Sequence, residues 1–239
     1  MIDITDLRFA WPRADADCVA IERLSFATGS TTFLFGPSGS GKSTLLGLLA
    51  GVLVPQSGQV RLLGTDWRSL PAARRDAFRA DHVGYIFQQF NLLPYLSLLD
   101  NVLLPCRFSA LRNARATRAN GSARSAAESL LQRVGLPASL WARPASALSV
   151  GQQQRVAAAR ALIGAPEVVI ADEPTSSLDA ALRDDFMALL LGACRESAEK
   201  SGSTLVFVSH DERLADRCDA RVSLPAINRA TRNAAQAST

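Results

Sequence analysis

The chain has 239 residues, 48% of them apolar, and a net charge of +4. This length fits one large domain or a domain with a subdomain, and the apolar content is sufficient for a sizeable core. The charge is modest and spread out, so it does not by itself indicate a nucleic-acid-binding protein. The four cysteines lie far apart, which fits a reducing compartment better than a disulfide framework or a zinc site. They are Cys18, Cys106, Cys194 and Cys218.

No N-terminal segment has the charged and then apolar pattern of a signal peptide. The longest apolar run covers ten residues, 45–54. A run of this length is too short to cross a bilayer and is more typical of a buried helix. If the protein works at a membrane, we expect another polypeptide to span it.

The first third of the chain alternates short apolar runs with turns, which predicts strands and a few helices. We expect strands over Ile2–Phe9, Val19–Phe26, Thr32–Phe35, Gln59–Leu63 and His82–Phe87, and helices over 45–50 and Pro71–Phe78. The first two strands have no helix between them. We therefore expect them to pair antiparallel, beside a mainly parallel sheet.

The middle of the chain, residues 88–160, has a helical character. Asn91–Pro105 is apolar but contains prolines, and Ser125–Val134 and Gln152–Ile163 read as helices. Arg107–Arg124 has no strong period; we interpret it as a mobile insertion or as a helix with an arginine face. These residues therefore predict a helical subdomain.

Beyond Glu167 the alternation of strands and helices resumes. Strands are expected over Val168–Ala171, Thr204–Val208 and Arg221–Leu224, and helices over Ala180–Ser197 and Glu212–Ala215. The segment after Pro225 is polar, so we expect it to fray.

A glycine-rich stretch follows the strand at 32–35 and opens the next helix. It has the spacing G-x-x-x-x-G-K-[ST] of a phosphate-binding P-loop: Gly36, Pro37, Ser38, Gly39, Ser40, Gly41, Lys42, Ser43 and Thr44. Glycines let backbone N–H groups wrap a phosphate, and the helix N-terminus adds a favourable dipole. Lys42 is expected to reach the β- and γ-phosphates, and Ser43 to place its hydroxyl on Mg²⁺.

The P-loop and the element pattern together define the expected fold class. It is an α/β P-loop NTPase (RecA-like) core with an antiparallel β edge and an inserted α-helical subdomain. The core is expected over 1–87 and 161–225, the helical subdomain over 88–160, and a C-terminal tail over 226–239.

A buried strand ends in two carboxylates, Asp172 and Glu173. The carboxyl end of a parallel strand lies at the edge of the sheet where ligands bind. We expect Asp172 to be the Mg²⁺ partner and Glu173 to be the general base that polarises the attacking water.

Leu148–Arg155 precedes a helix and supplies a second candidate anion site. Ser149 is a good N-cap, and its hydroxyl, the Gly151 N–H and the helix dipole face the same way. The P-loop of the same chain already provides the first phosphate site. Two phosphate-binding sites in one chain therefore suggest that two molecules of the protein share each nucleotide.

These stretches resemble the motifs of ATP-binding cassette (ABC) ATPases, in the order of that family and over about residues 2–225. The Walker A, signature and Walker B motifs correspond to 36–43, 148–152 and 168–173, and the Q-loop, D-loop and H-loop correspond to Gln88, 177–179 and 209–211. The resemblance implies a homodimer that sandwiches two MgATP molecules. Ser149, Gly151 and Gln152 would close on the γ-phosphate from the opposite subunit.

The resemblance also implies roles for three further residues. Gln88 would contact Mg²⁺ and the attacking water, His210 would contact the γ-phosphate, and Asp179 would lie at the dimer seam and bind nucleotide there. Asp179 also reads as a helix N-cap.

Two positions depart from the family's usual residues. Trp11 stands where an aromatic residue, often tyrosine, stacks on adenine; packing on the core is the alternative. Val150 stands where the family usually has glycine, and its Cβ bears on the geometry of dimer closure.

The segment Phe87–Val102 further resembles the lipoprotein-release and macrolide-export group. This implies a transmembrane permease that docks near residues 88–105, with Leu92–Leu99 forming a groove or, alternatively, helical core. The protein would lie at the cytoplasmic face of the inner membrane.

Two competing functions use the same motifs. The first is a cassette that acts on DNA or ribosomes, for which the only candidate patch is a set of arginines that also reads as a solvated face: Arg107, Arg112, Arg115, Arg118 and Arg124. We expect no nucleic acid partner, because the chain has neither a long coiled coil nor a second cassette. The second is a non-hydrolysing scaffold, against which Glu173 and His210 argue.

Overall fold

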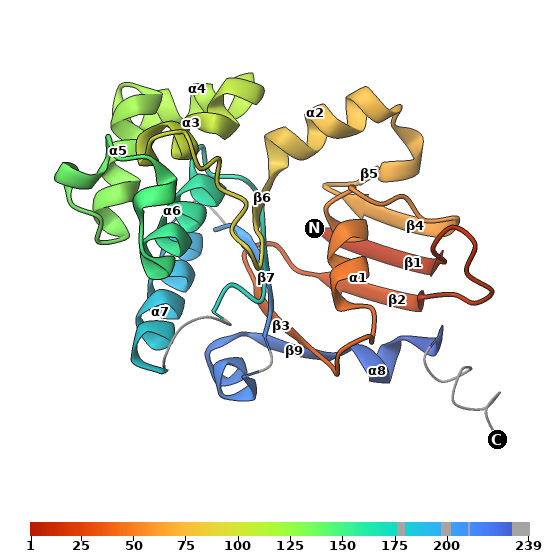
Figure 1. The fold of residues 1–239 in the computed structure, drawn as a ribbon. Helices are drawn as coiled ribbons and strands as arrows, with labels where there is room; N and C mark the ends of the chain where they lie inside the picture. The colour runs from red at the N-terminus through yellow and green to blue at the C-terminus, as the bar shows by residue number, and fades with distance from the viewer. Residues whose placement is uncertain (176–179, 197–201, 210, 231–239) are drawn as a thin grey trace.

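A computed structural model describes residues 1–175, 180–196, 202–209 and 211–230, which form two sheets and their helices (Figure 1). The strands are β1 (Ile2–Phe9), β2 (Val19–Phe26), β3 (Thr31–Phe35), β4 (Ser57–Leu62), β5 (Thr65–Asp66), β6 (Val83–Ile86), β7 (Val168–Asp172), β8 (Thr204–Val208) and β9 (Ala220–Ser223). The α-helices are α1 (Lys42–Leu49), α2 (Ala72–His82), α3 (Leu98–Phe108), α4 (Ala110–Asn120), α5 (Ala123–Arg133), α6 (Val150–Leu162), α7 (Ala180–Glu196) and α8 (Leu224–Ile227).

The antiparallel sheet has the strand order β2-β1-β4-β5, as expected for the first two strands. Along β1 the buried side chains change phase, because Ile4 and Leu7 both face the core. A register shift between Thr5 and Arg8, with Asp6 at φ 49°, produces this change. Since a strand alternates its faces strictly, an unshifted β1 would bury Asp6 in place of Leu7.

The second sheet is parallel, with the order β6-β7-β8-β3-β9. Its central strands β7 and β8 are largely apolar and buried because both faces of the sheet are covered there, whereas the edge strand β9 is exposed or half-buried. On β7, Val168 and Ile170 belong to the core shared with α1 and the antiparallel sheet, whereas Val169 and Ala171 belong to the core shared with α6 and α7. Helices α1 and α6 therefore cover opposite faces of the parallel sheet (Figure 1).

Helices α3, α4 and α5 lie beside α6 and share a third hydrophobic core with it (Figure 1). We call these four helices the helical group. The interpretation of Arg107–Arg124 as a mobile insertion is wrong for most of the segment, because α4 spans Ala110–Asn120. The alternative interpretation, a helix, is confirmed over Ala110–Asn120. The face of α4 that turns inward carries a buried arginine and a small residue, Arg112 and Ala116. The sequence therefore has no apolar period that could decide between the two alternatives.

Several element boundaries differ from the sequence prediction by a few residues. Helix α2 continues to His82, so the strand expected from His82 begins one residue later, at Val83. Fraying after Pro225 is wrong for residues 226–228, because α8 runs to Ile227 and Asn228 is fully buried. Within the described residues, no helix is both long and apolar enough to cross a bilayer.

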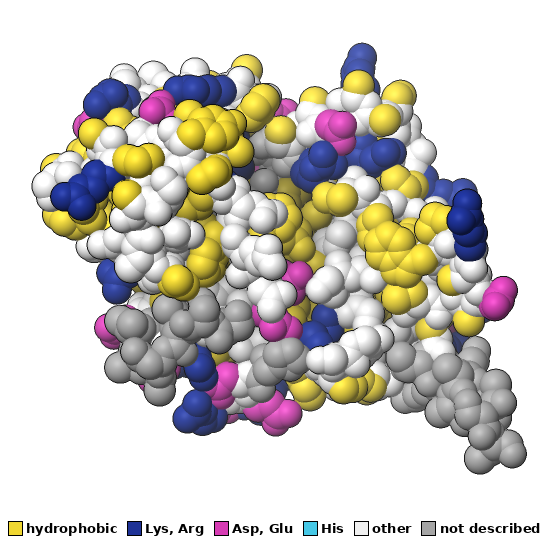
Figure 2. Space-filling model, viewed as in Figure 1, with side chains coloured by type: hydrophobic (Ala, Val, Ile, Leu, Met, Phe, Trp, Pro, Cys, Tyr) yellow, Lys and Arg dark blue, Asp and Glu magenta, His cyan; other side chains and the backbone are white. Residues whose placement is uncertain are grey.

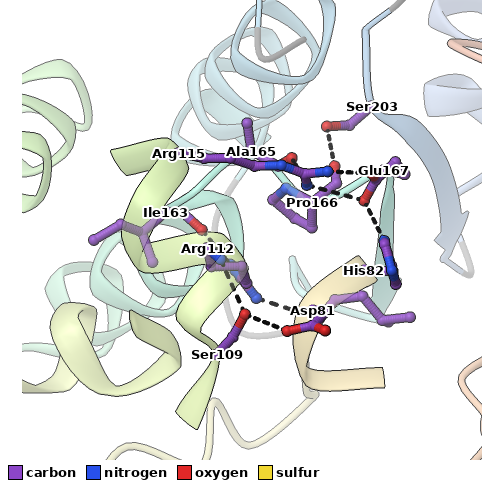
Figure 3. Close-up of polar contacts among 11 residues, drawn as sticks. Asp81, His82, Ser109, Arg112, Arg115, Ile163, Ala165, Pro166, Glu167 and Ser203 are labelled. Atoms are coloured by element: carbon purple, nitrogen blue, oxygen red, sulfur yellow. Dashed lines mark hydrogen bonds and ion pairs between the residues drawn. The ribbon is translucent and has the colours of Figure 1, made fainter. Parts of the chain in front are cut away.

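An ion-pair cluster joins the helical group to the start of β7 (Figure 3). Arg115 of α4 holds Glu167 with two hydrogen bonds, at 2.6 and 3.2 Å, and His82 Nδ1 lies 2.9 Å from Glu167 Oε2. Burial opposes ionisation of this carboxyl, but the hydrogen bonds from His82 and Arg115 outweigh it and lower the pKa of Glu167 to about 2. The ionised form of Glu167 therefore stabilises the folded chain.

We predict that Glu167→Gln lowers the free energy of unfolding at pH 7 by about 1–3 kcal/mol, the range for hydrogen bonds to a charged group. The unfolded chain takes up a proton at Glu167 near its ordinary pKa of 4.5, whereas the folded chain does so only near pH 2. The stabilisation is thus complete at pH 7 and is lost as the pH falls from about 4.5 towards 2, so the gap between wild type and variant should narrow there.

Urea unfolding at pH 7, 5 and 3 measures this gap. Glu196→Gln is the matched control, because Glu196 pairs with Arg133 at the surface, where its side chain is 68% exposed. This control should change stability by less than about 0.5 kcal/mol at every pH. If the difference in unfolding free energy between the wild type and Glu167→Gln is constant with pH, the low pKa of folded Glu167 is contradicted.

Candidate phosphate-binding site

The register of the parallel sheet brings three segments to one edge. Asp172 of β7 lies opposite Val208 of β8, which lies opposite Leu34 of β3. The residues that follow these strands are therefore neighbours at the carboxyl edge of the sheet. They are Glu173 after β7, Ser209 after β8 and the loop 36–41 after β3.

The loop between β3 and α1 contains three glycines whose backbone angles or close contacts disfavour a side chain. A Cβ on Gly36 would lie 2.9 Å from both Ser40 Oγ and Pro225 Cδ. Gly41 has φ +95°, and a Cβ there would lie 3.1 Å from the carbonyl oxygen of Cys18. Gly39, at φ +78°, is also left-handed. These backbone angles favour glycine, and they leave the loop N–H groups able to turn towards an anion.

The lysine of the loop is held in place by the loop itself. Lys42 is 7% exposed, and its Nζ donates hydrogen bonds to the carbonyl oxygens of Gly36 at 2.8 Å and Pro37 at 3.0 Å. The ammonium group is thereby positioned over the concave side of the loop. Pro37, Ser38 and the neighbouring Ser43 are exposed, whereas Thr44 is buried and its Oγ1 accepts from Cys18 Sγ at 3.6 Å.

The two carboxylates at the end of β7 differ in environment. Burial raises the pKa of Asp172, with Glu173 adding to the shift and a hydrogen bond from Ser43 opposing it. Glu173 has φ 45°, and its N–H donates to the Val208 carbonyl oxygen at 3.0 Å. A left-handed non-glycine residue is uncommon, and such backbone strain is concentrated at functional sites.

Oxygen-bearing side chains at this edge fit a magnesium ion. Mg²⁺ prefers oxygen ligands and is usually held by one or two protein groups together with substrate phosphates and water. Asp172 and Ser43 already share a hydrogen bond. Gln88, exposed two residues beyond β6, follows a strand whose Ile86 lies opposite Ala171, so it lies at the same edge as Asp172.

A capping box closes the N-terminus of α6, where the sequence predicts a second anion site. Ser149 Oγ accepts from the Gln152 N–H at 3.3 Å, and Gln152 Oε1 accepts from the Ser149 N–H at 3.0 Å. This capping box leaves Ser149 exposed and Gly151 half-buried. Val150 is 50% exposed, so its side chain points into solvent beside the expected anion site.

Of the remaining expected residues, Trp11 follows β1 of the antiparallel sheet, and the others lie outside the described residues. Trp11 is 47% exposed and packs edge-on against Phe9, with ring centroids 5.3 Å apart. Asp179 and His210 lie outside the described residues. Ser209, which precedes His210 in the sequence, lines a hollow of about 330 Å³ together with Gly36 and Pro37.

One residue at the site gave no signal in the sequence. Asn228 is 0% exposed, and its Nδ2 donates to the carbonyl oxygens of Ser40 at 3.2 Å and Cys18 at 3.0 Å. Its Oδ1 accepts from the Ala20 N–H at 2.8 Å. Asn228 thus joins the back of the glycine-rich loop to β2, and only its contacts, 188 and more residues away, distinguish it from a residue of a polar tail.

We predict that Asn228→Ala weakens nucleotide binding about tenfold, equivalent to 1.4 kcal/mol. The variant leaves buried N–H and carbonyl groups without partners, which costs about 1–3 kcal/mol and lets the loop relax. Titration with a fluorescent ATP analogue measures the affinity. Arg229→Gln, which changes the adjacent surface residue, should bind as wild type does, and unchanged affinity in Asn228→Ala would limit this residue to a role in stability.

Comparison with known proteins identifies the family. The profile of the ABC transporter family matches residues 22–176. The lipoprotein-releasing system ATP-binding protein LolD of Anaeromyxobacter dehalogenans is 45% identical over 201 residues, which cover 84% of this chain and 80% of that protein. The macrolide export ATP-binding/permease protein MacB of Rhodopirellula baltica is 38% identical over 221 residues, which cover 92% of this chain and 31% of that protein.

A solved structure gives the same result. The ATP-binding cassette MJ0796, in a dimeric post-hydrolysis state bound to ADP and Pi, has a TM-score of 0.80 and 31% identity, with 93% of this chain and 94% of that chain covered. The α/β fold class is thereby confirmed. With a family profile that spans most of the chain and relatives that match it over most of its length, the chain belongs to the ABC transporter family.

Proposed function

We propose that this protein is the ATP-hydrolysing subunit of a bacterial ABC transporter, acting as a pair of copies on a separate transmembrane permease. One observation carries the proposal. The glycine-rich loop and the acidic pair meet at one edge of the sheet, while the second anion site belongs to a helix on the opposite face. A site divided in this way is completed by a second copy of the chain.

Nucleotide binding follows from the loop geometry. The loop N–H groups and the α1 N-terminus bind the phosphates, and Lys42 exchanges its bonds to Gly36 and Pro37 for bonds to the β- and γ-phosphate oxygens. Trp11 presents its exposed indole to the adenine ring. Ser149, Gly151 and Gln152 of one copy close on the γ-phosphate held by the other, and Asp179 lies at the seam.

Hydrolysis depends on the acidic pair. Mg²⁺, when bound, neutralises charge that develops on the phosphates, and Ser43, Asp172 and Gln88 are the residues that would hold it. Glu173, whose backbone is left-handed with φ 45°, accepts a proton from the attacking water. His210 donates to the γ-phosphate. The dimeric MJ0796 cassette holding ADP and Pi is a relative in a comparable post-hydrolysis arrangement.

We predict that Glu173→Gln binds ATP as the wild type does but hydrolyses it at least about 100-fold more slowly, the usual loss when a general base is removed. Because ATP persists, the variant should form an ATP-dependent dimer on a sizing column. Phosphate release and column elution are the measurements.

Two variants control this experiment. Lys42→Ala should neither bind nor dimerise, and Glu128→Gln, which alters a surface pair with Arg124, should hydrolyse ATP normally. Normal turnover in Glu173→Gln would remove Glu173 from the role of base. An absence of turnover in the wild type, with and without its partner, would favour the scaffold alternative.

A groove between the helical group and α2 is the proposed docking site for the permease. It encloses about 350 Å³, and apolar side chains dominate its lining: Val52, Tyr85, Phe87, Leu104, Pro105 and Phe108. Hydrophobic side chains are visible on the surface of the helical group, interspersed with arginines (Figure 2). Of the expected docking region 88–105, Leu98 and Leu99 are buried in the helical core, so the groove lies farther along α3.

The occupant we propose is a membrane-embedded permease. MacB, in which this chain matches 31% of the length, is named as an ATP-binding/permease protein, whereas LolD is named as an ATP-binding protein of a lipoprotein-releasing system. An apolar groove that opens beside the cassette core suits a permease segment that protrudes from the membrane. The protein is then peripheral, at the cytoplasmic face of the inner membrane.

The nucleic-acid alternative loses its candidate patch. Arg112 is 2% exposed, and Arg115 is paired with Glu167. Arg107 pairs with Asp100, so these three side chains do not form a free basic surface.

We predict that Phe108→Asp abolishes permease binding and leaves basal ATP hydrolysis unchanged, because Phe108 is 77% exposed and lies in the groove. Tyr95→Asp is the matched control, since Tyr95 is 75% exposed but is not part of the groove. The integral membrane protein retained by the wild type would be identified, purified and titrated against both variants. Loss of binding in Tyr95→Asp alone would move the docking site to the segment around residue 95.

A further inference from the structure

Arg112 is almost fully buried, which is rare for an arginine. It lies on the inward face of α4, is 2% exposed, and burial lowers its pKa to about 10. Its main partners are backbone carbonyl oxygens. The guanidinium donates to the carbonyl oxygen of Ile163 at 2.7 Å (Figure 3). It also donates to the carbonyl oxygen of Ala161 at 2.7 Å and to those of Arg160 and Val83 at 3.4 Å each.

Three of these carbonyls belong to the C-terminal end of α6. That helix ends at Leu162, so its last carbonyls lack partners within the helix. Arg112 supplies donors to the carbonyls of residues 160, 161 and 163, and its positive charge opposes the negative end of the helix dipole. Arg112 therefore caps α6 from a neighbouring helix.

The capped end of α6 is packed too tightly to move independently of its neighbours. A Cβ on Gly164 would lie 2.6 Å from Arg112 Cβ, and a Cβ on Gly84 of β6 would lie 2.2 Å from the Ala161 carbonyl oxygen. Both glycines are thus required by close approach to this end of α6. The same end is joined to the segment after Gln88, because Arg160 donates to the Asn91 carbonyl oxygen at 2.6 Å and to that of Phe90.

The position of Arg112 on α4 is itself fixed. Ser109 caps α4 by accepting from the Arg112 N–H at 3.0 Å, and its hydroxyl donates to Asp81 of α2 at 2.5 Å. Arg112 also lines the apolar groove, together with Arg160 and Ala161. The groove, α4 and the end of α6 therefore share one side chain.

We infer that Arg112 is a positioning residue for the second anion site. Helix α6 is 13 residues long, or about 20 Å, with Ser149–Gln152 at one end and Arg112 at the other. By fixing the C-terminal end, Arg112 sets the direction in which the N-terminal end meets the nucleotide of the other copy. The inference rests on the proposed function, in which α6 completes the site of a second copy.

The test compares ATP-dependent dimerisation with ATP binding by the monomer, in the Glu173→Gln background. Arg112→Met should raise the ATP concentration for half-maximal dimerisation about tenfold and change monomer affinity less than twofold, because the glycine-rich loop lies on the other face of the sheet. Arg112→Lys keeps the charge but has a single nitrogen for four carbonyls, so a smaller shift is expected. If Arg112→Met does not fold, Arg112→Lys carries the test.

Two matched variants on the same helix separate positioning from stability. Arg115→Met removes the tether to Glu167 and should lower the melting temperature without shifting dimerisation. Arg118→Met alters an exposed residue of α4 and should change neither. A dimerisation curve for Arg112→Met within twofold of its parent, or an equal shift in Arg115→Met, would overturn the inference.

Amide hydrogen exchange of the monomer gives a second readout that needs no dimer. Arg112→Met should speed exchange at residues 150–154 and leave residues 42–48 unchanged. If the Glu173→Gln parent itself fails to dimerise, the proposed function fails, while faster exchange at 150–154 would still support a positioning role. Unchanged exchange there would reject that role.

Discussion

The arrangement of the nucleotide site depends on the backbone pairing of β8 with β3 on one side and with β7 on the other. This pairing sets the separation between the glycine-rich loop and the acidic pair. Because a ladder of main-chain hydrogen bonds fixes the register, the separation does not depend on any one side chain. The N–H of Glu173 adds one more hydrogen bond to the Val208 carbonyl oxygen, which extends the ladder one residue beyond β7.

The candidate anion-binding groups lie at two helix N-termini, and the two termini differ in construction. Helix α1 begins with glycines and an ammonium group, so its N–H groups are open to a ligand. Helix α6 begins with a closed capping box, in which Ser149 and Gln152 already satisfy each other. A ligand at α6 must compete with those internal hydrogen bonds, whereas a ligand at α1 finds N–H groups without such a cap. This difference is consistent with the first site binding ATP alone and the second joining it later.

The local parts of this structure could be read from the sequence, and the long-range parts could not. The glycine-rich loop, Asp172, Glu173 and the Ser149 cap are recognisable because their chemistry lies within a few residues. Arg112 and Asn228 make their contacts with partners up to 51 and 210 residues away. Neither contact leaves a periodic pattern, so the sequence predicts a basic patch or a solvated face for Arg112 and a polar tail for Asn228. Leu98 and Leu99 show the converse, because an apolar run does not distinguish a docking surface from a core.

The near-contact between Gly84 and α6 limits how the helical group can move. At this point the backbone of β6 meets the Ala161 carbonyl with no room for even a methyl group. The helix cannot slide closer to the sheet there, and Arg112 and Arg160 oppose its withdrawal. Helix α6 could still tilt about its contact with Gly84. Such a tilt would displace the residues near 161 only slightly and those near 149 farther. Gly84 would then be the point about which α6 tilts, and the lack of a side chain there would be required for that motion.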